Sequence, residues 1–531
     1  MRNSEFGMRN MVFRGYTKRD TAILKGFGIL CIVFHNYFHW LLPSPGENEF
    51  SFSPDRLFRF FDLLVNEPGE LVNTLFSYFG HYGVQVFLLV SGFGLTVSML
   101  RQEKGWLVFV WERFRKLYPL LLTGLVVCFL GMVLMQGRVF TSFEWQEIGY
   151  RLLFIHTLLP ESGLSFNGPW WFFALILQLY LLFPLLYRCM RRWGWKAFAV
   201  VCVVSYGMIF LFREVLTLYH GTILMQNAPG HLPEFCLGIL LAFSRDKKIS
   251  WAWLALAVAV FCLGNRYALF YPFTFLALSL VMVFAYQGLK SLSFKKRWLS
   301  EPLAYFGGIS MLLFAVHGYF RQPFLNLAAS WPTPLGHLST GLLFFVSVWM
   351  LSLGAAPLYN WLSGIFARIN IREGKVTKVV QPVLQVLLSL FFVWVFAHYV
   401  SQNLSARSTA VTTPPILMEE GMVAKTDNYV TFVSFDLEKN YSLIRVKGSF
   451  DLRSSDAEEQ LPLLVTDIRN TYWKSLKLRK RPDGEWTHYE FTCDYYRPFL
   501  DWVKGKRFSL YFWNLHQREM AFRDMQVELS Y

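Results

Sequence analysis

The stretch KGFGILCIVFHNYFH, residues 25–39, decides the fold class of this chain. It lies within the apolar segment Ile23–Leu42, and roughly 17–25 apolar residues are enough to cross a bilayer as a helix. Pro43–Pro45 follows the segment where a cleavable signal peptide would have a small-residue cleavage site. The sequence therefore predicts a retained first membrane span, and this span carries one lysine and two histidines, Lys25, His35 and His39.

The whole chain has the composition of a membrane protein. Of its 531 residues, 54% are hydrophobic and only 16% are charged, whereas a soluble domain carries about 25% charged residues. The apolar residues form long uncharged runs, such as Leu120–Met135 and Val383–Ala397. These runs predict a polytopic α-helical membrane protein with about ten core spans plus one extra. The eleven candidate spans are near residues 22–42, 73–99, 118–136, 169–187, 197–212, 229–244, 250–265, 268–288, 302–328, 335–365 and 381–400.

The basic residues are distributed unevenly between alternate loops. With the N-terminus in the cytoplasm, the inside segments hold 25 Lys and Arg residues, and the outside segments hold six. Such a bias sets the orientation of membrane proteins, so the net charge of +15 indicates topology rather than a nucleic-acid partner. We therefore expect a bacterial inner-membrane protein whose C-terminal part is extracytoplasmic. The six outside basic residues are Arg56, Arg59, Arg138, Arg151, Arg213 and Arg266.

A composition change after the last span predicts a second domain. The polar stretch Ser401–Pro415 has the Ser/Thr/Pro content of a linker, and alternating runs with turn residues follow it. Alternation with a period of two predicts an antiparallel β-sandwich. The predicted runs are 429–435, 442–450, 461–468, 486–491, 507–513 and 520–529. The predicted domains are a tail (1–16, whose start Met1–Gly7 resembles a cloning remnant), a transmembrane domain (17–378), an additional transmembrane helix (379–400), a linker (401–420) and an extracytoplasmic sandwich (421–531).

Cysteine usage gives no sign of a disulfide framework or a metal site. Six of the seven cysteines lie in apolar segments, and only Cys493 lies in the polar C-terminal part. A single thiol forms no disulfide within that domain, and no His/Cys spacing is typical of a metal site. We therefore expect no metal cofactor.

Polar side chains inside the first span are the strongest candidates for catalysis. A charged or titratable residue in a membrane helix is expensive and usually faces a cavity or a functional site. His35 and His39 share a helix face at i,i+4, and the ordinary pKa of histidine suits a general base. The alternative is that these histidines only hydrogen-bond to backbone or to neighbouring helices.

Six motifs in order resemble the membrane-bound acyltransferase-3 family, over Thr17–Ile365. The family's first helix carries a basic residue followed by a histidine, as Lys25 and His35 do. The other matching stretches are GVQVFLLVSGF (83–93), ERFRKLYP (112–119), NGPWWF (167–172) running into Phe183-Pro184, HLPEFCLG (231–238), and Gly308-Ile-Ser310 with His317. In many members the two first-helix residues are eleven positions apart. Lys25 and His35 are ten apart, which places them roughly 80° apart on a helix, so Lys25 is the weaker partner.

The resemblance implies a reaction and its two sides. Such enzymes are thought to take an acyl group from cytoplasmic acyl-CoA and to place it on an extracytoplasmic hydroxyl. The implied catalytic residues are His35, as general base, and Lys25. Arg113, Arg115 and Lys116, with Tyr118 of the same motif, would bind the donor, because cations pair with the phosphates of coenzyme A. The alternative for the three cations is ordinary positive-inside anchoring.

Further candidates are expected on the acceptor side. They are His39, Trp170, Trp171, His317, Arg321 and Glu234. The tryptophans could stack on a sugar, although the membrane interface is also a preferred place for Trp, and we expect it for at least one of them. Glu234 could orient a histidine or simply open a helix, and His317 could form an ordinary interhelical hydrogen bond.

The sequence thus favours an O-acyltransferase with acetyl-CoA, or another acyl-CoA, as donor and no metal. The expected partners are the lipid bilayer and an extracytoplasmic polysaccharide or glycolipid acceptor. Transfer through an acyl-histidine and direct attack both remain open. A glycan transporter or flippase is the alternative, although transporters often show internal symmetry that this sequence lacks. A receptor would need a cytoplasmic output module, and none is visible.

Overall fold

The structure is a computed structural model of the chain. It describes residues 10–41, 50, 52, 55–159, 162–212, 224–244, 247–293, 297–369, 371, 374–408, 416–423, 429–436, 443–454, 463–468, 472–477, 486–496, 507–513 and 519–530. Met1–Gly7 and residues 409–415 of the predicted linker lie outside the described residues. The chain divides into two compact units, of which the first holds residues 1–157, 163–213 and 221–384. The second holds residues 158–162, 214–220 and 385–531.

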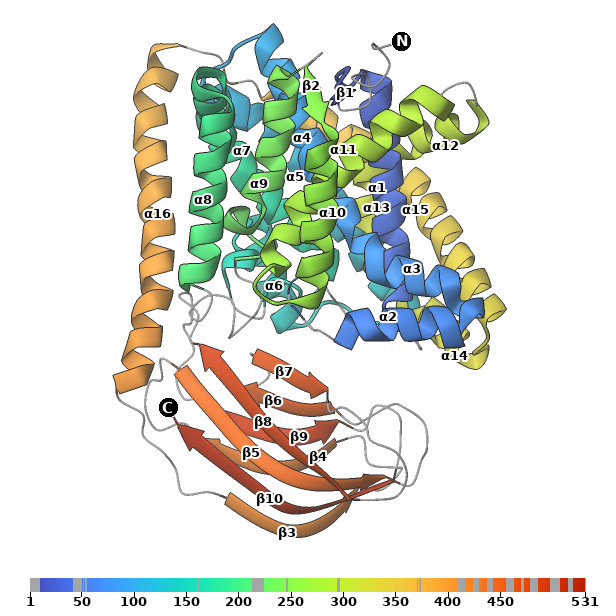
Figure 1. Cartoon of the computed structure of the whole chain (residues 1–531). Coiled ribbons are helices and arrows are strands. Elements are labelled where there is room, and N and C mark those ends of the chain that lie inside the picture. Colours follow the sequence, from blue (N-terminus) through green and yellow to red (C-terminus); the bar gives the residue numbers. More distant parts are fainter. Residues whose placement is uncertain are drawn as a thin grey trace. The chain divides into compact units, whose positions relative to one another are not determined.

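The first unit is a bundle of helices (Figure 1). Its α-helices are α1 (Lys18–Phe38), α2 (Asp55–Asn66), α3 (Leu71–Phe79), α4 (Gly83–Arg101), α5 (Trp106–Gln136), α6 (Ser142–Leu152), α7 (Trp171–Trp193), α8 (Trp195–Phe212), α9 (Ala228–Phe243), α10 (Trp251–Arg266), α11 (Thr274–Ser293), α12 (Arg297–Gly308), α13 (Ser310–Val316), α14 (Gln322–Ser330) and α15 (Pro334–Arg368). Short 3₁₀ helices are η1 (Pro68–Glu70), η2 (Gly80–Tyr82), η3 (His156–Leu158), η4 (Gly168–Trp170) and η6 (Tyr271–Phe273). The long helix α16 (Lys375–Ser408) follows the bundle in sequence and continues into the second unit.

Membrane-length helices are fewer than the eleven spans expected. Among the described residues, eight helices are long and apolar enough to cross a bilayer, or nine if the bent pair α12 and α13 is one span. The apolar helices α9 and α10 have 16 residues each, so each is about 24 Å long, against a hydrocarbon core of about 30 Å. The eight are Lys18–Phe38, Pro68–Arg101, Trp106–Gln136, Gly168–Trp193, Trp195–Phe212, Tyr271–Lys290, Pro334–Arg368 and Val376–Ser401.

The predicted span 302–328 is broken. Helices α12 and α13 meet at an angle of 59°, and α14 follows as a separate helix. The sequence at the break is Gly307-Gly-Ile-Ser310, and sharp kinks commonly occur at Gly and Ser residues. The Ser310 hydroxyl donates to the Gly307 carbonyl at 2.9 Å. The break therefore follows from local chemistry that an apolar run does not reveal.

Glycines allow the bundle helices to pack closely. Gly26 of α1 lies against the backbone carbonyl of Leu303 in α12, leaving no room for a Cβ atom. Gly92 of α4 lies against the Phe235 carbonyl of α9, and Gly238 of α9 lies against the Leu89 carbonyl of α4. Small residues at such contacts are typical of membrane helix packing. These crossings fix α1 against α12, and α4 against α9.

The N-terminal segment is folded against the bundle. Strand β1 (Asn10–Val12) pairs antiparallel with β2 (Lys248–Ser250), and the Phe13 amide donates to the Lys247 carbonyl. The ring of Phe13 is fully buried and contacts Tyr16 and Phe93 edge to face. A capping box of Thr17 and Asp20 then begins α1. Residues 10–16, which the sequence placed in a tail, are thus part of the folded bundle.

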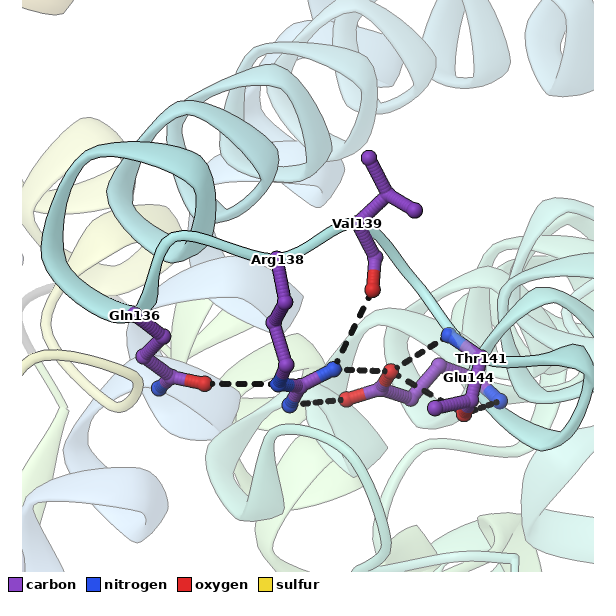
Figure 2. A network of polar contacts seen from close by, with 5 residues as sticks. All are labelled: Gln136, Arg138, Val139, Thr141 and Glu144. Carbon is purple, nitrogen blue, oxygen red and sulfur yellow. Dashed lines mark hydrogen bonds and ion pairs between the residues drawn. The ribbon is translucent and has the colours of Figure 1, made fainter.

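The connection from α5 to α6 carries a polar network (Figure 2). Gly137, with φ of +62°, ends α5, and a second capping box of Thr141 and Glu144 begins α6. The Arg138 guanidinium donates to both Glu144 carboxylate oxygens, at 2.8 and 2.9 Å. Its hydrogen bond holds the pKa of the Glu144 carboxyl below the usual range.

A second ion pair lies inside α6. Arg151 donates to the Glu147 carboxylate at 2.6 Å, and both side chains are buried. The Arg151 guanidinium also donates to the Ser165 carbonyl, and it lies over the Phe166 ring. Because each buried charge is compensated and hydrogen-bonded, this pair holds the loop before η4 in place.

The second unit contains two four-stranded antiparallel sheets. Their strands are β3 (Ile416–Val423), β4 (Tyr429–Asp436), β5 (Leu443–Ser454), β6 (Leu463–Ile468), β7 (Tyr472–Lys477), β8 (Thr487–Tyr496), β9 (Arg507–Trp513) and β10 (Met520–Ser530). One sheet has the order β3-β10-β5-β8, and the other has β4-β9-β6-β7. Helix α16 extends to Ser408, and β3 begins at Ile416, so both occupy parts of the predicted linker 401–420.

Candidate functional site

Three histidines gather where α1 ends. His35 and His39 are stacked, with ring centroids 4.6 Å apart, and the His81 ring of η2 lies 5.4 Å from that of His35. All three are buried, with exposed fractions of 2%, 7% and 2%. We call His35, His39 and His81 the histidine cluster. The shared face of His35 and His39 follows from their i,i+4 spacing, whereas His81 comes from a different element.

Backbone carbonyls fix the tautomers of His35 and His39. Nδ1 of His35 lies 3.1 Å from the Phe76 carbonyl, and Nδ1 of His39 lies 2.5 Å from the His35 carbonyl. A carbonyl only accepts, so Nδ1 carries the proton in both rings, and Nε2 is the basic nitrogen of each neutral imidazole. This is the orientation that a general base needs.

The cluster depends on a close approach between α1 and η2. A Cβ atom on Gly80 would lie 2.6 Å from the His35 Cβ and 2.7 Å from the Cys31 carbonyl oxygen. Both distances are below van der Waals contact, so only glycine fits at position 80 without moving α1. Gly80 therefore sets how closely His81 approaches His35.

Lys25 lies on a different face of α1 from His35. The helix is uninterrupted from Lys18 to Phe38, so the separation of roughly 80° between the two residues is kept. Lys25 is half-buried, and no described carboxylate lies within ion-pair distance of its ammonium group. The structure thus does not bring Lys25 into the histidine cluster.

A basic cleft of about 1110 Å³ lies at the opposite end of α1. We call it the basic cleft, and its basic residues are Arg14, Lys18, Arg101, Arg113 and Lys116. No Asp or Glu lines it among the described residues, while Tyr16, Thr17, Ser98 and Gln102 add polar atoms. Its charge and size suit an anionic ligand with several phosphates.

The cleft contains two of the four predicted donor residues. Arg113 and Lys116 line it, whereas Arg115 and Tyr118 do not. Tyr118 stacks on Phe114 at 4.8 Å and contacts Phe154 and Phe366. The cleft adds three cations, Arg14, Lys18 and Arg101, that the sequence marked only as basic residues of inside segments.

The cleft and the cluster lie at opposite ends of the same helices. The start of α1 lines the cleft at Lys18 and Thr21, whereas His35 is near the end of α1. The last turns of α4, from Phe93 to Arg101, line the cleft, whereas η2 and His81 precede α4. Ala242, at the end of α9, also lines the cleft. Helices α4 and α9 therefore run in the same direction, and α1 runs opposite to them.

Arg321 is a predicted acceptor-side residue that lies beside the histidine cluster. Its guanidinium is 4.5 Å from the centroid of the Trp40 ring, and Trp40 contacts His39. His317, at the end of α13, is fully buried, and its Nδ1 lies 2.9 Å from the Phe314 carbonyl. That contact is made within α13 itself, so it is not the interhelical hydrogen bond of the alternative interpretation, and the role of His317 stays a prediction.

Trp170 and Trp171 are both buried inside the bundle, and a position at the membrane interface stays a prediction for them. The Trp170 indole donates to the Ala315 carbonyl at 2.9 Å. Trp171 stacks on His231, with centroids 5.6 Å apart. The start of α9 brings Glu234 to 3.6 Å from Nδ1 of that histidine. Glu234 thus faces a histidine, as one of the two sequence interpretations proposed.

The sequence did not single out His81, His231 or the extra cleft cations. His81 stands just before the motif at residues 83–93, and the alternation of spans would have placed it at the same end as His35. In the described ranges, no three His, Cys, Asp or Glu side chains are grouped to hold a metal ion.

Comparisons with known proteins find two relatives that match parts of the chain. A segment of 136 residues is 35% identical to the acyltransferase MdmB of Streptomyces mycarofaciens, covering 23% of this chain and 35% of that protein. A second segment of 268 residues is 24% identical to nodulation protein 10 of Rhizobium leguminosarum bv. viciae, covering 46% of this chain and 66% of that protein. The chain thus spans about a third and just under two thirds of these relatives' lengths.

No solved structure matches the chain. The acyltransferase-3 family model, described as an acyltransferase domain, matches residues 22–354, which is more than half of the chain. The chain therefore belongs to the acyltransferase-3 family.

Proposed function

We propose that this protein transfers an acyl group, with acetyl expected, from a cytoplasmic acyl-CoA to a hydroxyl of an extracytoplasmic polysaccharide or glycolipid. It would act in a bacterial inner membrane, with its N-terminus in the cytoplasm. One observation carries the proposal: the basic cleft, which no described Asp or Glu lines, and the buried histidine cluster lie at opposite ends of α1 and α4. This is the arrangement that a reaction with its two substrates on different sides of a membrane requires.

The donor would bind by its phosphates in the basic cleft. Arg113 and Lys116 act together with Arg14, Lys18 and Arg101 as counter-charges for coenzyme A. The first α4 residue that lines the cleft is Phe93, about 18 Å along the helix axis from His81. Only a long, thin part of the donor, such as the arm that carries the thioester, can bridge that distance.

At the cluster, Nε2 of His35 would take the proton of the acceptor hydroxyl as its oxygen attacks the thioester carbonyl. The new ester forms, the carbon–sulfur bond breaks, and the thiolate leaves with coenzyme A and gains a proton. Backbone carbonyls hold the tautomers of His35 and His39, which supports this role. In the covalent alternative the same nitrogen attacks first and forms an acyl-imidazole. Lys25 remains a second candidate on the other face of α1.

The C-terminal strands would form a β-sandwich that serves the acceptor side. Phe432 of β4 contacts Phe522 of β10 edge to face at 4.8 Å, so side chains of the two sheets meet. Ile444, Val446 and Phe450 alternate with outward residues and are fully buried. These contacts support face-to-face packing of the two sheets.

The test is acyl transfer in liposomes that contain the purified full chain. Radiolabelled acetyl-CoA is supplied on one side, and isolated envelope polysaccharide is assayed for label on the other. His35→Ala should lower the rate by about 10²- to 10⁴-fold, the usual contribution of a general base. His337→Gln is the matched control, because His337 is also buried but pairs with Glu70 outside the cluster. Folded wild-type protein that transfers no acyl group from any acyl-CoA would refute the proposal, as would an unimpaired His35→Ala variant.

A further inference from the structure

Three buried polar side chains on α4 and α9 have no role in the mechanism above. Gln85, His231 and Glu234 have exposed fractions of 1%, 0% and 1%. Within the described parts of the chain, several of their atoms find no hydrogen-bond partner: both amide atoms of Gln85, Nδ1 of His231 and both carboxylate oxygens of Glu234. Buried polar groups are nearly always hydrogen-bonded, so a group of such atoms indicates a site built for a ligand.

The helix packing places these side chains opposite one another. Gly92 and Gly238 mark where α4 and α9 touch, and the two helices run in the same direction from this crossing to the basic cleft. Gln85 is seven residues before Gly92 and shares its face. Glu234 and His231 are four and seven residues before Gly238 and share the face of that glycine. All three therefore lie away from the cleft, at the end of the bundle that holds the histidine cluster.

Aromatic rings connect this region to the cluster. His231 contacts Phe275 at 5.9 Å, and Phe275 contacts Tyr82 at 6.1 Å. The Tyr82 ring lies 3.9 Å from that of His81, which lies beside His35. A continuous series of ring contacts therefore links His231 to the histidine cluster.

The chemistry of the pair decides what it can bind. Nε2 of His231 lies 2.7 Å from the Met225 carbonyl, which only accepts, so Nε2 is protonated and Nδ1 of the neutral ring is an acceptor. Nδ1 faces the Glu234 oxygen at 3.6 Å. When neither facing atom carries a proton, both atoms are acceptors, and a hydrogen-bond donor between them satisfies both. A hydroxyl group supplies one, whereas a thioester supplies only acceptors and a phosphate would be repelled by the carboxylate.

We propose that Gln85, His231 and Glu234 form a hydroxyl-binding subsite that holds the polyhydroxylated acceptor beside the histidine cluster. The inference rests on the proposed function and adds to it the residues that recognise the acceptor. Glu234 and Nδ1 of His231 accept from sugar hydroxyls, while the Gln85 amide both donates and accepts. These are binding residues, and the proton transfer remains with His35.

The first test needs no turnover. Thermal melting of the full chain in nanodiscs compares wild type with Gln85→Leu and Glu234→Gln, without ligand. If the polar groups serve a ligand, their removal relieves buried atoms that lack partners, and Tm should stay the same or rise. Glu147→Gln is the matched control, because that buried carboxylate is paired with Arg151 and its loss should lower Tm. A fall of several degrees in both test variants would show structural roles and overturn the inference.

The second test measures both substrates, with radiolabelled acetyl-CoA as donor and a series of methyl hexopyranosides as acceptor probes. Gln85→Leu and Glu234→Gln should raise the acceptor KM about tenfold or more and change the donor KM less than twofold. Gln287→Leu, at a buried glutamine on α11, should change neither. An unchanged acceptor KM, or an equal rise in both KM values, would overturn the inference. A wild-type protein that acylates no glycoside would instead count against the proposed function, while the melting comparison still decides whether the subsite exists.

Discussion

Replacing Gly80 with alanine should separate the two halves of the histidine cluster. The added Cβ would lie 2.6 Å from the His35 Cβ, whereas ordinary contact begins near 3.4 Å, so α1 and η2 must move apart by about 0.8 Å. The Cys31 carbonyl, at 2.7 Å, blocks a simple sideways shift. A misplacement of about 1 Å at a reacting centre costs about 100-fold in rate. Overpacking of this kind also costs about 1–3 kcal/mol of stability.

The assay is acetyl transfer by the purified full chain, with Tm measured on the same samples. Gly80→Ala should lose about two orders of magnitude in kcat while it still folds, because 1–3 kcal/mol lowers Tm by a few degrees for a protein of this size. Gly207→Ala is the control, since a Cβ there meets nothing within 4 Å and alanine favours the helix. A Gly80→Ala variant with kcat within threefold of wild type would refute the view that this contact positions His35.

Other perturbations test the cleft, the N-terminal segment and the α5–α6 connection. Arg113→Ala combined with Lys116→Ala should raise the donor KM tenfold or more and weaken its salt dependence, whereas Lys247→Ala, outside the cleft, should not. Phe13→Ala should raise the donor KM by releasing the segment that carries Arg14 and Lys18, and Val12→Ala, at a 43% exposed side chain, should not. The hydrogen bond from Arg138 lowers the pKa of Glu144 in the folded protein. The pair therefore stabilises the protein fully at pH values above the unfolded-state pKa of Glu, about 4.3. That stabilisation is lost as the pH falls through the lower pKa of the folded state. The Tm difference between wild type and Arg138→Ala should therefore shrink from pH 6 to pH 3, and a constant difference would contradict this.

The positions of the helices could be predicted because a helix that crosses lipid needs a long run of apolar residues. Each of the eleven predicted segments coincides with an apolar helix or with the broken pair α12 and α13. The count of full spans could not be predicted as well, because the segments 229–244 and 250–265 were counted as spans although each has only 16 residues. Helices α9 and α10 have the same 16 residues in length, which is short of a full crossing. Glycines such as Gly307 are common in membrane helices, so the sequence alone did not distinguish a packing glycine from a break.

Two strands show the same limit in the C-terminal unit. Strand β3 contains Gly421 and two adjacent glutamates, and it lacks the alternation that marked the other strands. It is a strand because it pairs with β10 at the edge of a sheet, and Gly421 leaves room for the Phe522 ring. Strand β7 runs into a basic stretch and is fixed by its pairing with β6. Pairing partners far apart in the chain are not visible in a local pattern.

Of the site, the sequence could identify His35, because a histidine within an apolar span has an energetic cost that calls for an explanation. His81 carries no such signal, since it lies at the start of a segment and reaches His35 only through the tertiary contact at Gly80. The same is true of Arg14, Lys18 and Arg101. In the sequence, each of them is indistinguishable from an ordinary basic residue of an inside loop. They line one cleft only because residues 10–18 fold against the end of α4.

The two ends of α1, α4 and α9 carry different charges, and this difference should direct each proposed substrate to its own site. The basic cleft has no acidic lining residue among those described, so it attracts a polyanionic donor. At the other end, Glu234 would repel phosphates but accept hydrogen bonds from hydroxyls. Because α1 and α4 extend from the cleft to the histidine cluster, and α9 joins the cleft to Glu234, one set of rigid elements fixes both sites at a constant separation. A donor held by its phosphates then places its thioester at the same position in every reaction cycle. The acceptor should bind poorly in the basic cleft, because none of the described cleft residues has a carboxylate that could accept hydrogen bonds from its hydroxyls.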